Sequence, residues 1–386
     1  MHASSASTAP RPDRSPNWGT AAIAAALFFG MFVIYWLSIP DHFNEIYNNR
    51  RFFDSDGEFI TRQFYQNKTF THNNHLLYHV SARLLFEAGL DVVRSHKFLS
   101  VFWGALGVSI LFVGGRYWTG RLLPALIAAL FVGGAAAYWF FAATIDTYVP
   151  QVASGAAALV AALVCLRTQR PAAYFALGAL LGLAFLFRTD GFLMATTALV
   201  ILERPRDPWR RLAALAAGGV LVGVVGYALL AWRFYGVPPA EALAFAFPDR
   251  PEMAAGQWGR WANVDPASLW LTFAGAAGRA IVLAIVDPAG RRSGAGREPA
   301  FLTLLGLAWL LPRIVFYAWW DPFDPFLFAC TSLPAFWLTW LHAFGTPVEA
   351  SRWTKPMLAG AAVLVAAIWL HNIVYLVMPM RAASVG

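Results

Sequence analysis

The sequence predicts an all-α protein that crosses a membrane many times. Of its 386 residues, 59% are hydrophobic and only 13% are charged, whereas roughly a quarter of the residues of a typical soluble domain are charged. Apolar runs close to the ~20 residues that a helix needs to cross a bilayer recur along the whole chain. Strands of a membrane β-barrel would alternate over ~10 residues instead, so helices are predicted to span the membrane.

About eleven transmembrane helices are predicted within one transmembrane domain, residues 20–378. They are expected near residues 20–39, 98–117, 121–143, 147–167, 172–188, 190–203, 212–235, 267–286, 300–320, 323–343 and 357–378. The sixth is short, so we expect a half-helix or a segment closely coupled to the fifth span. Residues 1–19 are predicted to be a disordered cytoplasmic tail, and residues 379–386 form a second tail.

Basic residues determine the predicted orientation. Every second loop is rich in Arg or Lys: residues 116–121, 167–170, 203–211, 290–298 and 352–355. Because cytoplasmic loops carry an excess of these residues, the N-terminus is predicted to be cytoplasmic and the alternate loops to face outward. The net charge of +8 is spread over these short loops instead of forming one patch, so nucleic acid is not an expected partner.

Carboxylates are concentrated on the predicted outer side. The stretch FFDSDGEFI (52–60) holds three of the 21 acidic residues of the chain directly after the first span. Asp146, Asp190 and Asp321 lie at the outer ends of three separate helical hairpins. A helical bundle would bring such positions close together, so we expect any chemistry to take place on the outer side.

The first outer loop, residues 40–97, is too long for a simple connector, and long loops are usually functional. Within it, HLLYHVSARLLFEAGL (75–90) is predicted to be an amphipathic helix. Its polar positions repeat every four residues: His75, His79, Arg83 and Glu87. Either this stripe is a solvated helix face, or histidines of the loop join a carboxylate at a divalent metal or a phosphate. The candidate metal ligands are Asp54, Asp56, His72 and His75.

The layout resembles the GT-C superfamily of membrane glycosyltransferases, and within it the bacterial branch that is similar to protein O-mannosyltransferases. The motifs that carry the resemblance are DSDGEFI (54–60), HNNHLLYH (72–79), WFFAATIDTYVPQ (139–151), GLAFLFRTDGFL (182–193) and WWDPFDPFLF (319–328). It covers residues 20–200 well and residues 315–343 loosely. The chain departs from the branch at Asn73 and Asn74, which replace a proline-rich turn.

The resemblance implies a sugar donor linked to polyprenyl phosphate, used at the outer face of a bacterial inner (plasma) membrane with inversion at the anomeric carbon. Membrane lipids and this donor are then the expected partners. Such a transfer needs a base that takes the proton of the acceptor and cations that stabilise the leaving phosphate. Asp56 and Asp54 compete for the role of the base. Donor binding is expected at Arg188, Arg313, His75, Asp146, Tyr148, Asp190 and Asp321.

Each candidate also has a structural interpretation. Asp54 and Asp56 could be solvated loop residues, and Asp321 could belong to a rigid turn with the prolines beside it. Asp146 could cap the helix that follows it. Arg188 could form an ion pair with Asp190. Arg313 could snorkel toward the surface or pair with an outer aspartate.

Two other classes of function compete with a transferase. A transporter or flippase needs polar residues along the whole membrane depth, often in two related halves. In this sequence the ionisable residues gather at the predicted outer ends of the spans, and no two halves match. A non-enzymatic assembly factor would not require acidic residues from separate loops to converge.

Overall fold

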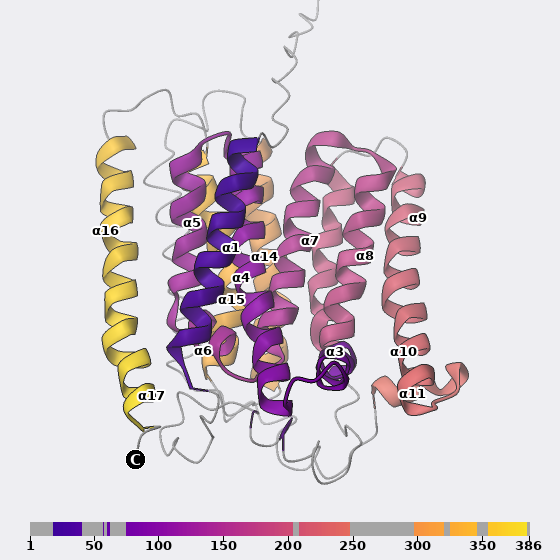
Figure 1. Ribbon diagram of the computed structural model, residues 1–386. Coiled ribbons are helices and arrows are strands. Elements are labelled where there is room, and N and C mark those ends of the chain that lie inside the picture. Colours follow the sequence, from indigo (N-terminus) through magenta and orange to yellow (C-terminus); the bar gives the residue numbers. More distant parts are fainter. Residues whose placement is uncertain are drawn as a thin grey trace, which may run out of the picture.

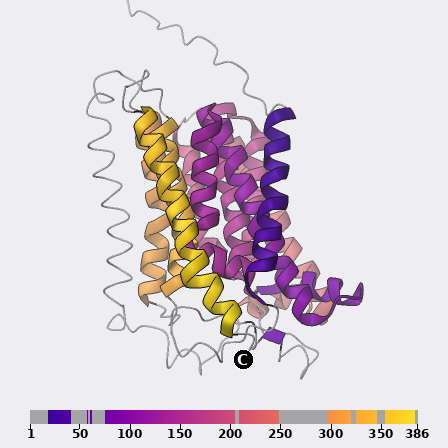
Figure 2. The same cartoon turned by 60° about the vertical axis from the view of Figure 1, so that its left-hand side comes forward.

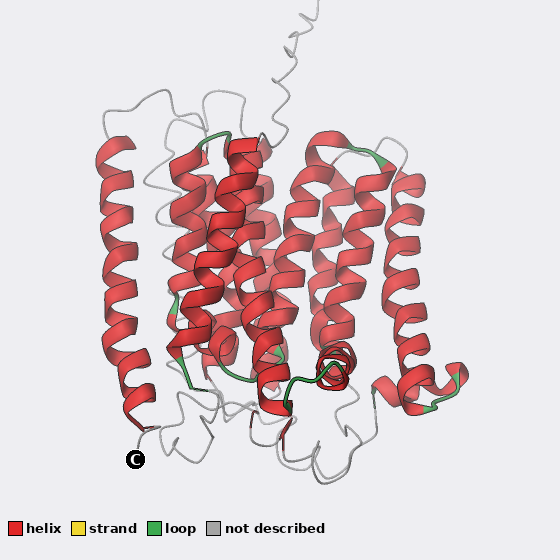
Figure 3. Ribbon diagram, in the orientation of Figure 1, coloured by secondary structure: helices red, strands yellow, loops and turns green. Residues whose placement is uncertain are grey.

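Figure 1 shows the protein as a computed structural model. The structure describes residues 18–40, 57, 60–61, 75–203, 208–247, 297–319, 325–345 and 354–383. Every regular element in these ranges is a helix, as the sequence predicts (Figure 3). By length and composition, five of the described helices can cross a membrane, and a sixth span results if one bent helix pair is counted as a single span.

Most of the helices form one bundle, in which the long ones run up and down (Figure 1). In chain order they are α1 (Trp18–Ser38), α4 (Val92–Thr119), α5 (Leu122–Gly134), α6 (Ala136–Ala143), α7 (Tyr148–Thr168), α8 (Pro171–Phe187), the 3₁₀ helix η3 (Thr189–Glu203), α9 (Pro208–Gly219), α10 (Gly226–Tyr235), α14 (Arg297–Trp319), α15 (Pro325–Gly345), α16 (Thr354–Asn372) and α17 (Met378–Ala383). Short π-helical segments, Val220–Val225 and Ile373–Val377, join α9 to α10 and α16 to α17.

Three short helices lie at one end of the bundle, which we call the α3 end (Figure 1). They are α3 (Leu76–Glu87), η5 (Pro239–Glu241) and α11 (Ala242–Ala246). Figure 1 views α3 along its axis and Figure 2 shows it from the side, so α3 lies across the bundle.

The predicted spans agree with the observed helices within a few residues, with three exceptions. The helix predicted to begin at residue 98 begins at Val92. The span predicted over residues 121–143 is broken into α5 and α6, which meet at 64°. The span predicted over residues 267–286 lies outside the described residues, so the total of eleven stays a prediction.

The break between α5 and α6 follows a pair of glycines, Gly133 and Gly134, and frees backbone carbonyls inside an apolar environment. Neighbouring helices supply the missing donors: the Tyr35 hydroxyl donates to the Gly133 carbonyl at 2.8 Å, and the Asn372 amide donates to the Gly134 carbonyl at 2.5 Å. A broken helix is tolerated at membrane depth only when its backbone groups are satisfied in this way. Glycine is needed at 134 because a Cβ there would lie 2.0 Å from Nε1 of Trp369.

The short sixth span is a 3₁₀ helix of 15 residues, η3. A 3₁₀ helix rises ~2.0 Å per residue, so 15 residues cover ~30 Å, whereas the same residues would cover only ~22 Å as an α-helix. The hydrocarbon core of a bilayer is ~30 Å thick. The stretched geometry therefore gives a segment of this length about the reach of the hydrocarbon core. It packs against α8, as its expected coupling to the fifth span required.

Helix α3 is amphipathic, but its polar stripe is divided. Arg83 and Glu87 form an exposed ion pair at 2.8 Å, as a solvated face predicts. His75 and His79 are instead buried, with 5% and 1% of their surfaces exposed. The expectation of a fully solvated stripe is wrong for these two histidines, because the first two turns of α3 pack against the bundle while the last turn projects from it.

The predicted orientation can be tested with cysteines at the two ends of the bundle. Both native cysteines, Cys165 and Cys330, are buried and should not react with the labelling reagent. Ala88 is exposed at the α3 end and Ala172 is exposed at the opposite end. A membrane-impermeant maleimide should label Ala88→Cys in intact cells and should label Ala172→Cys only after permeabilisation. The reverse pattern would invert the orientation.

Candidate functional site

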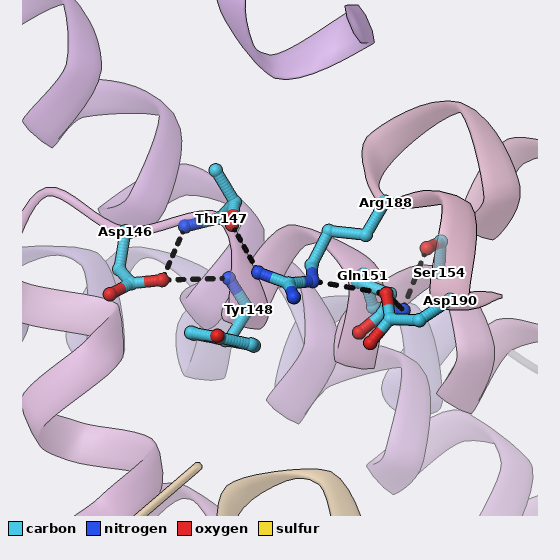
Figure 4. Close-up of polar contacts among 7 residues, drawn as sticks. All are labelled: Asp146, Thr147, Tyr148, Gln151, Ser154, Arg188 and Asp190. Atoms are coloured by element: carbon cyan, nitrogen blue, oxygen red, sulfur yellow. Dashed lines mark hydrogen bonds and ion pairs between the residues drawn. The ribbon is translucent and has the colours of Figure 1, made fainter. Parts of the chain in front are cut away.

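Polar side chains converge at the α3 end of the bundle, where α7 begins and where α8 passes into η3 (Figure 4). Four of the predicted site residues meet there: Asp146, Tyr148, Arg188 and Asp190. Thr147 and Gln151 join them through hydrogen bonds. We call these six residues the α7 cluster.

Asp146 caps the start of α7. Its Oδ1 accepts hydrogen bonds from the backbone N–H groups of Thr147 at 2.6 Å and Tyr148 at 3.2 Å. The carboxylate is 1% exposed. The first N–H groups of a helix have no partner within the helix, and the helix dipole favours negative charge at this position. The structural interpretation of Asp146 is therefore the one that the geometry shows.

Arg188 and Asp190 form a buried ion pair. Nε of Arg188 lies 3.1 Å from Oδ1 of Asp190, and the two side chains are 4% and 11% exposed. Nη1 of Arg188 donates to the Thr147 hydroxyl at 2.8 Å, and its guanidinium lies 3.8 Å from the centre of the Tyr148 ring. Figure 4 shows the arginine reaching from the end of α8 across the start of α7. These contacts tie the two helices together at the α3 end.

A second polar network attaches α3 to the same region. The Tyr78 hydroxyl donates to the His96 carbonyl of α4 at 3.1 Å and lies 3.1 Å from Oγ of Ser100. Ser100 in turn donates to the Asp146 carbonyl at 3.1 Å. The network thus runs from α3 through α4 to the first residue of the α7 cluster.

The rings of His79 and His96 pack against Tyr78, and the His75 ring packs against His79. The centre of the His79 ring lies 6.3 Å from that of His75 and 6.0 Å from that of His96. Nδ1 of His96 is 2.8 Å from the Val92 carbonyl, so this nitrogen carries the proton. The rings contact one another face to edge or at a tilt. Within the described part of the chain, no three His, Cys, Asp or Glu side chains are arranged to hold a metal ion.

Arg313 is buried in α14, with 2% of its surface exposed. Its Nη1 donates to the Trp309 carbonyl at 2.8 Å, and its guanidinium stacks on the Trp309 ring at 4.1 Å. The indole N–H of Trp309 donates to the Thr331 carbonyl at 2.8 Å. Arg313 therefore keeps its charge inside the bundle instead of snorkelling to the surface.

The structure tests only part of the predicted site. Asp54, Asp56, His72 and Asp321 lie outside the described residues. Of the others, His75 is buried directly before the first residue of α3, and Arg313 is buried on α14. The sequence analysis missed Gln151, Thr147 and Ser100. All three are uncharged, although Gln151 and Thr147 stand within the motif WFFAATIDTYVPQ that carried the resemblance.

The fold has counterparts among solved structures. The crystal structure of ArnT from Cupriavidus metallidurans bound to undecaprenyl phosphate matches 92% of this chain with a TM-score of 0.58 and 17% sequence identity. The apo structure of the same protein matches 91% of the chain with a TM-score of 0.57 and 17% identity. In both comparisons the matched region is 64% of the ArnT chain, so this chain spans about two thirds of its length.

At this level of identity the likeness concerns the fold. The chain has the membrane fold of ArnT, and the expected fold class, an all-α protein with many membrane-spanning helices, is confirmed. The GT-C superfamily and its O-mannosyltransferase-like branch stay predictions from the sequence resemblance. No protein-family model and no curated protein sequence matches the chain.

The ion pair between Arg188 and Asp190 predicts that substitutions of these two residues have strongly coupled effects on the free energy of unfolding. Asp190→Leu should lower the free energy of unfolding by ~3–5 kcal/mol, because it leaves a buried guanidinium without its carboxylate. Arg188→Met with Asp190→Leu should regain most of this loss, since neither charge then remains. Thermal unfolding of the single and double variants measures the coupling. Losses that simply add would show that the two side chains stabilise the protein independently.

Proposed function

We propose that the protein is a membrane glycosyltransferase that takes a sugar from a polyprenyl-phosphate donor and transfers it to an acceptor at the α3 end of the bundle. The observation that carries the proposal is the fold: it extends over 92% of the chain and is shared with a structure solved with undecaprenyl phosphate bound. The convergence of buried polar residues at one end of the bundle supports it. The membrane is that of a bacterial cell envelope, with the N-terminus in the cytoplasm and the α3 end outside.

In the proposed reaction, Asp56 or Asp54 takes the proton of the acceptor as the acceptor attacks the anomeric carbon. The bond from this carbon to the phosphate oxygen breaks, and the sugar configuration inverts. Negative charge grows on the leaving phosphate, so a nearby cation lowers the barrier. Arg313 is the proposed phosphate ligand, because the planar guanidinium matches two phosphate oxygens at once.

The α7 cluster has a different part in this proposal. The capping contacts of Asp146 and the ion pair of Arg188 with Asp190 set the positions of α7, α8 and η3 around the donor. Tyr148 offers an aromatic ring, and His75 and Asp321 complete the proposed donor site from α3 and from the segment between α14 and α15. A divalent metal stays an open part of the proposal, with Asp54, Asp56, His72 and His75 as the candidate ligands; His75 is the one candidate that the structure describes.

The catalytic assignment predicts a loss of transfer without a loss of folding. Asp56→Asn should slow sugar transfer by ~10²- to 10⁴-fold, because the general base is removed. Asp54→Asn is the matched control, and comparison of the two shows which carboxylate is the base. Transfer from undecaprenyl-phosphate monosaccharides in nanodiscs measures the effect. If neither variant is slowed more than a few-fold, the base lies elsewhere; if the wild-type protein binds lipid but never transfers sugar, a lipid flippase becomes the better proposal.

The assignment of Arg313 predicts graded binding of bare undecaprenyl phosphate. Arg313→Lys keeps the charge but loses the two-pronged geometry, and Arg313→Leu loses both. Affinity should fall in the order wild type, Lys, Leu, as measured with the purified protein in detergent. Arg94→Leu is the matched control, since Arg94 is an exposed arginine at the same end of the bundle. Unchanged binding in a folded Arg313→Leu protein would remove Arg313 from the donor site.

A further inference from the structure

Gln151 is the buried amide of the α7 cluster, and its orientation is fixed by chemistry. Its Nε2 donates to Oδ1 of Asp190 at 2.8 Å, and Gln151 is 1% exposed. A carboxylate accepts hydrogen bonds and cannot donate them, so the amide nitrogen must face Asp190. The amide oxygen, Oε1, therefore points away from this carboxylate. It is fully buried and has no hydrogen-bond partner among the residues that the structure describes.

A buried hydrogen-bond acceptor without a donor limits which chemical groups can bind next to it. Burying a carbonyl oxygen without a donor costs its full desolvation penalty, so such groups are normally satisfied by protein, water or ligand. Another acceptor, such as a phosphate or carboxylate oxygen, would be repelled by Oε1. A hydroxyl group donates and fits. The chemistry of Gln151 thus differs from that of Arg188 and Arg313, which favour anions.

The position of Gln151 relates it to the proposed phosphate ligand. Gly155, one turn further into the bundle on α7, lies against α14: a Cβ at 155 would be 2.7 Å from the Trp309 ring and 2.3 Å from Sδ of Met194. Gln151 is one turn closer to the α3 end than Gly155, and Arg313 is one turn closer to it than Trp309. The Trp309 ring therefore links the two residues: it meets Gly155, one turn from Gln151, and Arg313 stacks on it.

We propose that Gln151 recognises the sugar of the donor, with Oε1 accepting a hydrogen bond from a sugar hydroxyl. This inference rests on the proposed function and adds a residue to it. A phosphate bound by Arg313 carries its sugar directly on one of its oxygens, and the Trp309 ring on which Arg313 stacks also meets α7 at Gly155, so the sugar is proposed to reach α7. Asp190 holds the amide in its accepting orientation. Gln151 is then a specificity residue for the sugar and makes no contact with the phosphate.

The test compares two ligands that differ only in the sugar. The probes are bare undecaprenyl phosphate and the undecaprenyl-phosphate monosaccharide from which the wild-type protein transfers. Gln151→Met, which keeps the volume and removes the acceptor, should weaken binding of the sugar-linked lipid ~10-fold or more and that of the bare lipid less than ~3-fold. Ser154→Ala is the matched control on the next turn, because the Ser154 hydroxyl donates to backbone carbonyls of its own helix. It should change neither affinity.

Three outcomes would overturn the inference. Equal weakening of both lipids by Gln151→Met would mean that Gln151 only supports the ion pair, and no weakening would mean that a water satisfies Oε1. A raised KM for the acceptor with unchanged donor binding would assign Oε1 to the acceptor. If the Met variant does not fold, Gln151→Asn retains the amide one methylene shorter, and the same selective loss is expected. Failure of the proposed function is seen separately, as a wild-type protein that does not bind bare undecaprenyl phosphate.

Discussion

One turn of α4, residues 96–100, holds together the three segments on which the α3 end depends. The Lys97 ammonium donates to the Ile39 carbonyl, where α1 ends. The His96 carbonyl and the Ser100 hydroxyl bind Tyr78 of α3, and Ser100 also donates to the Asp146 carbonyl ahead of α7. The acidic motif that contains Asp54 and Asp56 lies in the sequence between Ile39 and Tyr78. Both ends of that segment are therefore fastened to the same helical turn.

This anchoring turn obeys the constraint that shapes the rest of the bundle. In an apolar slab a backbone or side-chain polar group without a partner costs free energy, so most such groups find a partner within the protein. At the α5–α6 break, the partners are the side chains of Tyr35, Asn372 and Trp369. In η3 they come from the helix itself, since a stretched 3₁₀ helix still bonds its backbone internally. Polar side chains are thus placed where the α5–α6 break leaves backbone carbonyls without partners in their own helix.

The sequence predicted the features that depend on length and charge. Apolar runs located the described spans to within a few residues, and the shortness of the sixth was correctly read as unusual. Its 3₁₀ geometry could not be predicted, because the length and hydrophobicity of an apolar run do not distinguish a 3₁₀ helix from an α-helix. Likewise, a period of four residues in α3 indicated a polar stripe, but burial of His75 and His79 depends on what packs against α3.

The sequence likewise predicted only part of the site, namely its charged residues. Charged residues at hairpin ends are visible in a sequence, so Asp146, Arg188 and Asp190 were found together with their structural interpretations. The structure shows the capping bonds and the ion pair of the structural interpretations, and donor binding by these residues stays a prediction. Gln151 was missed because an uncharged amide carries no pattern. Its importance appears only when one of its atoms is seen bonded to Asp190 and the other is seen buried without a donor.

The same contacts bear on how such a site could favour a transition state. Each charged group of the α7 cluster is held by at least two contacts: Asp146 by two backbone N–H groups, and Arg188 by Asp190, Thr147 and the Tyr148 ring. Groups held in this way do not reorganise when charge develops beside them, which is the condition for electrostatic stabilisation in a dry site. They also cannot move to follow a misplaced ligand. Under the proposed function, a sugar donor must fit the cluster, and the rigidity that stabilises the fold is then a source of selectivity between sugars.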